Sequence, residues 1–77
     1  MVNVELLKAE IEDLGVTKGK IAEKCGISRP TLESWLERPE LISAKGAKAL
    51  ADALRITEPE KLLAIFFADE VDKNVNV

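Results

Sequence analysis

The sequence predicts a small all-helical fold, and three observations lead to that prediction. Apolar residues recur every three or four positions through residues 1–68, and no stretch there alternates as a strand would. Breaks that contain glycine, proline or a helix-capping residue divide this region into five segments. The chain has 77 residues, 47% of them hydrophobic and 32% charged, which suits one folded domain rather than a disordered chain. We therefore predict a five-helix domain over residues 1–68 and a flexible tail over residues 69–77.

The first two helices have clear start and stop signals. Asn3 and Thr17 are good N-cap residues, and Gly15 and Gly26 favour the left-handed conformation that ends a helix. We expect one helix between Asn3 and Gly15 and a shorter one between Thr17 and Gly26. The apolar faces of these helices are Val4, Leu7, Ile11 and Leu14 in the first, and Ile21, Ala22 and Cys25 in the second.

The other three helices carry similar signals. Ser28 caps the third, in which Pro30 falls in the first turn and Pro39 prevents continuation. Ser43 caps the fourth, and residues 57–60, Thr-Glu-Pro-Glu, predict the start of the fifth through a capping box and a first-turn proline. The apolar faces of these helices are Leu32, Trp35 and Leu36 in the third, Ala47, Leu50, Ala51 and Leu54 in the fourth, and Leu62, Leu63, Ile65, Phe66 and Phe67 in the fifth.

Composition excludes several classes of protein. The longest apolar run, Leu62 to Ala68, has seven residues, whereas a membrane span needs about 20. The N-terminus lacks a basic stretch followed by an apolar segment, so we expect no secretory signal and a cytoplasmic location. Cys25 is the only cysteine and histidine is absent, which leaves no internal disulfide and none of the usual zinc ligand sets. We expect no metal, no cofactor, no small-molecule ligand and no membrane partner.

The same absences argue against an enzyme. A nucleophile needs a nearby base with a tuned pKa, and a chain without histidine has few ways to build such a pair. The 14 carboxylates are expected to form a solvated surface, so no catalytic residue is predicted. A small hydrolase is the alternative that a concave pocket with perturbed carboxylates would favour.

The net charge of −3 is distributed unevenly along the chain. Residues 17–48 carry seven basic and four acidic residues, whereas residues 1–16 and residues 49–77 each have a net charge of −3. Such an uneven distribution of charge can direct a basic face toward a polyanion, while the acidic faces limit non-specific binding to it. A split of this size also arises by chance in soluble proteins, so charge alone does not select DNA binding.

The most informative segment is residues 17–36, where two short helices flank a turn of about three residues. Ala22 is small at the point where the second of these helices would pass, and Gly26 supplies the left-handed turn conformation. When the crossing angle is fixed, one helix of such a pair can rest across a phosphate backbone while the other enters the major groove. The apolar residues expected to fix that angle are Ile21, Cys25, Ile27, Leu32 and Trp35.

This segment resembles the helix-turn-helix of the lambda-repressor and Cro family. Lys18 takes the first place of that motif, Ala22 the small fifth place and Gly26 the ninth. The resemblance extends over residues 4–67 and includes the order of the five helices. It implies a lambda-repressor-like domain with the helix-turn-helix at helices 2 and 3. The implied function is that of a small phage-type transcriptional regulator that binds double-stranded DNA sequence-specifically at the bacterial nucleoid.

The resemblance also implies residues that contact bases. Arg29 corresponds to the leading base contact of the family, and arginine suits guanine through paired hydrogen bonds to O6 and N7. Pro30 occupies a neighbouring contact position, where it can touch only a thymine methyl group or a sugar. Glu33 and Ser34 face the same groove, in which Glu33 can accept from cytosine N4 and Ser34 tolerates several bases.

Other residues are implied as phosphate contacts. The family usually has glutamine at the first motif position, which bonds a phosphate and buttresses a recognition-helix residue. Lys18 can hold a phosphate there but is expected to be a poor buttress. Arg38 and Lys45 flank the motif, where ordinary solvated charge is the alternative interpretation. The expected phosphate-contacting residues are Thr17, Lys18, Ser28, Thr31, Arg38 and Lys45.

Family members commonly act as dimers on half-sites about 34 Å apart. Leu63 and Phe67 form a second apolar line at i and i+4 on the fifth helix, so we expect a homodimer interface there, with completion of the core as the alternative.

The predicted tail has one alternative to a frayed end. Its residues Val75 and Val77 could add a strand to a partner chain. A helical protein-interaction module without DNA reading is the alternative function.

Two residues of the motif admit a second interpretation each. Trp35 can belong to the core or stack on a base, and its helical spacing with Leu32 favours the core. Cys25 can be a small buried residue or a sensor of oxidants, and the first is favoured.

Overall fold

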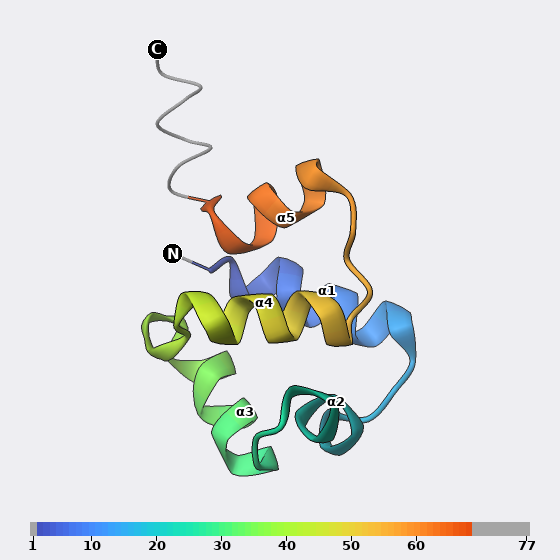
Figure 1. Cartoon of the computed structure of the whole chain (residues 1–77), viewed down its shortest axis with the longest axis vertical. Helices are drawn as coiled ribbons and strands as arrows, with labels where there is room; N and C mark the ends of the chain where they lie inside the picture. The colour runs from blue at the N-terminus through green and yellow to red at the C-terminus, as the bar shows by residue number, and fades with distance from the viewer. Residues whose placement is uncertain (1, 69–77) are drawn as a thin grey trace.

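The computed structural model describes residues 2–68, and these residues form five α-helices and one short 3-10 helix (Figure 1). No strand occurs in this part of the chain, so the all-helical prediction is confirmed there. The predicted tail, with Val75 and Val77, lies outside the described residues. The elements are α1 (Val4–Leu14), α2 (Lys18–Cys25), α3 (Arg29–Glu37), η1 (Pro39–Leu41), α4 (Ala44–Ala53) and α5 (Pro59–Phe66).

The predicted caps define the starts of the first four α-helices. In each, a side-chain oxygen of the N-cap residue accepts a hydrogen bond from a backbone N–H in the first turn, which satisfies one of the free donors there. Gly15 and Gly26 end α1 and α2 with φ of 74° and 73°, the left-handed conformation that favours glycine. The cap contacts are Asn3 with Leu6, Thr17 with Lys20, Ser28 with Thr31 and Ser43 with Gly46.

The start of α5 differs from the prediction. The helix begins at Pro59 with Glu58 as its N-cap residue, and no side chain makes a cap hydrogen bond there. The predicted capping box from Thr57 is therefore wrong, because the proline occupies the first helical position and leaves Thr57 one residue too early. The η1 turn, which begins at Pro39, was also not predicted, although α3 does end before Pro39 as expected.

Each α-helix contributes one of the five largest fully buried side chains: Leu7, Ile21, Leu32, Leu50 and Ile65. Burial of each such side chain stabilises the fold by about 1.5–3 kcal/mol. α2 packs against both α3 and α4, and α1 packs against α3 and α5. As a result, α2 and α3 lie at one end of the molecule and α5 at the other, with α1 and α4 between them (Figure 1).

Two polar contacts attach α5 to the beginning of the chain. The backbone N–H of Asn3 donates to the carbonyl oxygen of Ile65 over 2.6 Å, and Lys61 Nζ lies 3.0 Å from Glu10 Oε1. The hydrogen bond to Glu10 and its charge raise the pKa of Lys61. The contribution of Lys61 to stability is therefore present at neutral pH and is lost as the pH rises through its raised pKa.

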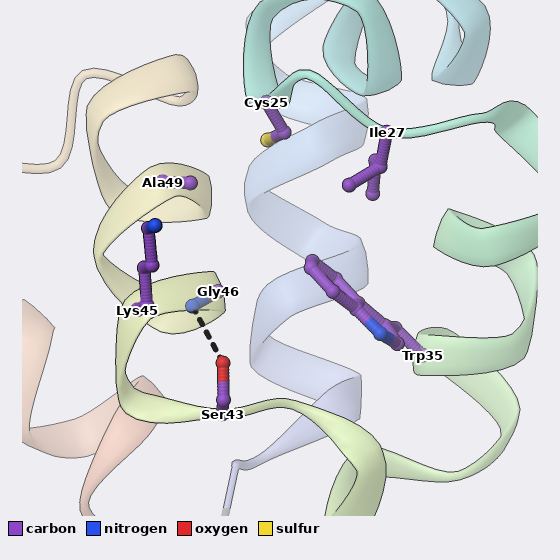
Figure 2. Close-up of a pocket in the computed structure, with 7 residues that line it drawn as sticks. All are labelled: Cys25, Ile27, Trp35, Ser43, Lys45, Gly46 and Ala49. Carbon is purple, nitrogen blue, oxygen red and sulfur yellow. Dashed lines mark hydrogen bonds between the residues drawn. The ribbon is translucent and has the colours of Figure 1, made fainter.

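The indole ring of Trp35 of α3 lies next to Gly46 of α4 (Figure 2). A Cβ atom at position 46 would lie 2.9 Å from Cη2 and 3.3 Å from Cζ2 of the indole ring. Gly46 is buried and its N–H donates to Ser43 Oγ at 3.0 Å. The lack of a side chain at position 46 is therefore what allows the indole to cover the start of α4.

None of the described helices has both the length and the apolar character needed to cross a membrane.

Gly46→Ala is expected to lower the free energy of unfolding by about 1–3 kcal/mol, because the added methyl group would displace Trp35. Gly19→Ala is the matched control, since its Cβ would have no neighbour closer than 3.9 Å. Alanine there should raise stability by about 0.5–1 kcal/mol through better helix propensity. Urea unfolding followed by the fluorescence of the single tryptophan measures both changes, and equal stability of the two variants would contradict the prediction.

Candidate nucleic-acid interface

The exposed side of α3 brings together the four predicted base-contacting residues. Arg29, Pro30, Glu33 and Ser34 are all exposed, and their spacing places them on one side of the helix. We refer to these four residues as the α3 outer face. The opposite side of α3 carries Leu32 and Leu36, which are buried in the core. The helix is therefore anchored by one side and presents a polar surface on the other.

Arg29 is the first residue of α3 and is exposed. Ser28 is the N-cap residue, so the helix begins at the next residue, which is Arg29. Among residues 2–68, no carboxylate forms an ion pair with the Arg29 guanidinium. Its five donors are therefore available to an acceptor outside this part of the chain.

Lys18 and Glu33 form an ion pair between α2 and the α3 outer face. Lys18 Nζ donates to Glu33 Oε1 over 3.3 Å, and the two side chains are 42% and 47% exposed. The long side chain of Lys18 thus spans the distance between the two helices, and the expectation that Lys18 is a poor buttress stays a prediction. An exposed pair of this kind contributes only about 0–1 kcal/mol to stability, so its main effect is to orient the carboxylate.

The predicted hydroxyl contacts lie at the N-termini of α2 and α3. Thr17 Oγ1 accepts from the N–H of Lys20 over 3.1 Å and keeps its own proton for an outside acceptor. The hydroxyls of Ser28 and Thr31 lie 2.9 Å apart, and one donates to the other. While that bond persists, only one of these two hydroxyls has a proton left for a phosphate.

The two flanking basic residues are also exposed. Arg38 caps the C-terminus of α3, and Lys45 lies in the first turn of α4. Lys45 lines a hollow of about 220 Å³ together with Cys25, Trp35 and Gly46 (Figure 2). Exposure is compatible with both interpretations of these residues, phosphate contact and solvated charge.

Two further basic residues at this end were not among the predicted contacts. Lys20 and Lys24 are exposed on α2, four residues apart and therefore on one side of the helix. That spacing is the signal in the sequence that could have grouped them. They add positive charge to the end of the molecule that carries the α3 outer face.

Trp35 and Cys25 are partly buried and pack against the core. The core interpretation of Trp35 is therefore supported, since its indole covers Gly46. Burial raises the pKa of the Cys25 thiol, which disfavours the thiolate and with it the reactivity that an oxidant sensor needs.

The two residues predicted for a homodimer interface are strongly exposed. Leu63 is 46% and Phe67 is 49% exposed, so the alternative that they complete the core is wrong. Leu6 and Leu41 are the other large exposed apolar residues of the described chain, and neither was singled out from the sequence. Leu63 lies in α5 and Phe67 follows it directly, and α5 lies at the opposite end of the molecule from α2 and α3 (Figure 1).

In comparisons with known proteins, no protein-family model, no curated protein and no solved structure matches this chain.

The raised thiol pKa predicts that Cys25 reacts slowly. Alkylation by iodoacetamide at pH 8 should be slower in the folded protein than in the same chain unfolded in urea, because less thiolate is present in the folded state. As the pH rises, the thiol loses its proton at a lower pH in the unfolded chain than in the folded protein. The free energy of unfolding should therefore decline above pH 9.0. Mass spectrometry of the alkylated product measures the rates, and faster reaction in the folded state would refute the prediction.

Proposed function

We propose that this protein is a sequence-specific DNA-binding transcriptional regulator of the lambda-repressor and Cro type, with no catalytic role. In this proposal α2 and α3 are the helix-turn-helix, and α3 enters the major groove. The observation that carries the proposal is the α3 outer face, on which an arginine without an ion pair among residues 2–68, a glutamate and a serine are exposed, whereas Leu32 and Leu36 on the opposite side are buried. A helix anchored in this way can present side chains to base edges without losing its place in the core.

The distribution of charge supports the same proposal. Seven basic residues occur between Thr17 and Lys48, the part of the chain that forms α2, α3 and the first half of α4. Phosphate contacts release counterions, so binding through these residues should weaken as salt rises. The proposed phosphate contacts are Thr17, Lys18, Ser28, Thr31, Arg38 and Lys45.

We propose further that the protein acts as a homodimer through α5. A single domain can contact only a few phosphates. Two domains bound to adjacent half-sites would combine their contacts and so bind DNA more tightly. The exposed Leu63 and Phe67 are the apolar residues that such an interface would cover. Because α5 lies at the opposite end from α3, self-association there leaves the α3 outer face accessible (Figure 1).

A protein-interaction module is the second candidate function. It is favoured by the net charge of −3 and by Leu6, Leu63 and Phe67, which expose apolar surface on α1 and at α5. Retention on non-specific duplex DNA at low salt separates the two candidates, since a DNA-binding protein should be held and then released as salt rises.

Arg29→Ala is expected to weaken binding to a preferred site by about 1–3 kcal/mol and to relax the choice of base at one position, because the paired bonds to guanine are lost. A preferred site is obtained by selecting bound sequences from a random duplex pool, and affinities are then measured by fluorescence anisotropy. Lys61→Met is the matched control, because it also removes one positive charge but lies on α5. An equal loss on all sequences for Arg29→Ala would argue against its role as a base contact.

Phe67→Ser is expected to convert a dimer into a monomer without unfolding the domain, because Phe67 is exposed in the isolated chain. Leu41→Ser is the control, since Leu41 is similarly exposed, at 51%, but lies in η1. Sedimentation equilibrium over a range of concentrations measures the association. A wild-type protein that stays monomeric at every concentration, or a Phe67→Ser variant that still dimerises, would rule out this interface.

A further inference from the structure

The hollow beside Trp35 is formed by residues of three helices. It has a volume of about 220 Å³ and is lined by residues of α2, α3 and α4 and of the turn between α2 and α3. We refer to it as the Trp35 hollow. An engineered apolar cavity of about 150 Å³ is large enough to bind benzene, so this hollow has room for one substituted aromatic ring. No small-molecule ligand is expected from the sequence, since the hollow forms only when the three helices pack together.

The walls of the Trp35 hollow are mainly apolar. Its nonpolar lining residues are Cys25, Ile27, Trp35, Gly46 and Ala49. Figure 2 shows Gly46 and Ala49 on the α4 side and the indole ring of Trp35 across from them. An indole ring attracts another aromatic ring in an offset or edge-to-face arrangement, which adds to the gain from burying apolar surface. The walls therefore favour an aromatic ring over a polar solute.

The polar groups on the α4 side give the hollow a preference for negative charge. Ser43 Oγ accepts from the N–H of Gly46 over 3.0 Å, and its own proton stays available. Lys45 is exposed, and no carboxylate of residues 2–68 pairs with its ammonium group. The lining residues include no acidic side chain. An anionic group at this hollow would thus meet two donors and no like charge.

Lys45 lies at the edge of the hollow rather than inside it. Figure 2 shows its side chain running along α4 in the direction of Ala49. Its flexible four-carbon stem lets the ammonium group turn toward a ligand group at the opening. A carboxylate at the opening also stays partly hydrated, which avoids the high cost of burying a charge completely. The arrangement suits a ligand whose ring lies inside and whose carboxylate lies at the edge.

We propose that the Trp35 hollow binds a small aromatic carboxylate, with the ring against Trp35 and the carboxylate paired to Lys45. The site goes beyond the proposed function, but its occupation has a consequence for that function. Lys45 is also a proposed phosphate contact, so a carboxylate bound to it competes with a DNA phosphate. The ligand is therefore expected to lower the affinity for DNA, and this consequence rests on the proposed function.

Benzoate is the probe for the site, and benzyl alcohol and benzylamine are its neutral and cationic analogues. Trp35 is the single tryptophan of the chain, so its fluorescence reports contact with the ring. Benzoate should change this fluorescence saturably with a Kd of about 1 mM. Benzyl alcohol should bind about fivefold more weakly, and benzylamine more weakly still, because neither pairs with Lys45. Titration of N-acetyltryptophanamide corrects for collisional quenching.

Three variants separate the contribution of charge from that of the walls. Lys45→Met keeps most of the aliphatic stem and should weaken benzoate binding about fivefold, while the affinity for benzyl alcohol stays unchanged. Lys48→Met is the matched control, because it removes the same charge from α4 but Lys48 does not line the hollow. Ala49→Leu should fill the hollow and abolish binding of both compounds. Circular dichroism checks folding, and the exposed Lys45 keeps the test decisive if Ala49→Leu does not fold.

The consequence for DNA is measured on a duplex by fluorescence anisotropy. Sodium benzoate well above its Kd should weaken DNA binding by the wild-type protein about two- to fivefold relative to sodium chloride at the same concentration. The Lys45→Met variant should show no such difference, because its position 45 carries no charge for which the carboxylate and the phosphate compete.

The fluorescence titrations decide the site without reference to DNA. No saturable change at benzoate concentrations up to about 20 mM would overturn the proposal, as would equal affinity for benzoate and benzyl alcohol. If benzoate binds as expected but DNA affinity does not fall, the site stands and the effect on DNA is wrong. A protein that binds no duplex at all would contradict the proposed function, whereas the site would still be accepted or rejected by the titrations.

Discussion

The packing of α2 against α3 is the constraint on which the rest of the structure depends. Ile21 and Leu32 have no exposed surface, and Ala22 is only 2% exposed beside them. Only three residues connect the two helices, and Gly26 makes the turn with φ of 73°. With so short a connection, a larger side chain at the buried position 22 would disturb the packing around α2, because a turn of three residues allows the two helices little relative movement. The direction of every side chain on the α3 outer face therefore follows from this contact.

The same packing allows α3 to hold polar groups in a defined direction at little cost in stability. Leu32 and Leu36 anchor the helix in the core, and Trp35 covers Gly46 at its edge. The cap at Ser28 determines that Arg29 is the first helical residue. Lys18 of α2 forms an exposed ion pair with Glu33. Buried contacts thus set the position of α3, whereas an exposed ion pair and a cap set the details of its surface.

Local features of the fold could be predicted from the sequence, and features that depend on distant partners could not. Asn3, Thr17, Ser28 and Ser43 act on backbone groups three residues away, so their caps were evident from the residues alone. The exposed line of Leu63 and Phe67 also followed from helical spacing. The Lys18–Glu33 contact spans 15 residues, and the Trp35–Gly46 contact joins two helices, so both depend on tertiary packing. The start of α5 was misjudged because Thr57 and Pro59 give competing signals, and the proline determines the first helical residue.

The net charge of −3 opposes DNA binding only if the charge acts evenly over the molecule. Neighbouring helices pack about 8–10 Å apart, whereas surface charges are screened over about 8 Å at physiological salt. The layer formed by α1 and α4 lies between α5 and the α2–α3 end (Figure 1), so carboxylates on α5 are more than one screening length from a phosphate beside α3. In the proposed function, the local charge balance at the α2–α3 end, which is positive overall and has Glu33 paired to Lys18, would then determine the interaction with DNA. By the same reasoning, removing the charge of Lys18 would weaken the electrostatic attraction to a nearby phosphate. The acidic residues of α5 would change that attraction only at low salt, where screening is weak.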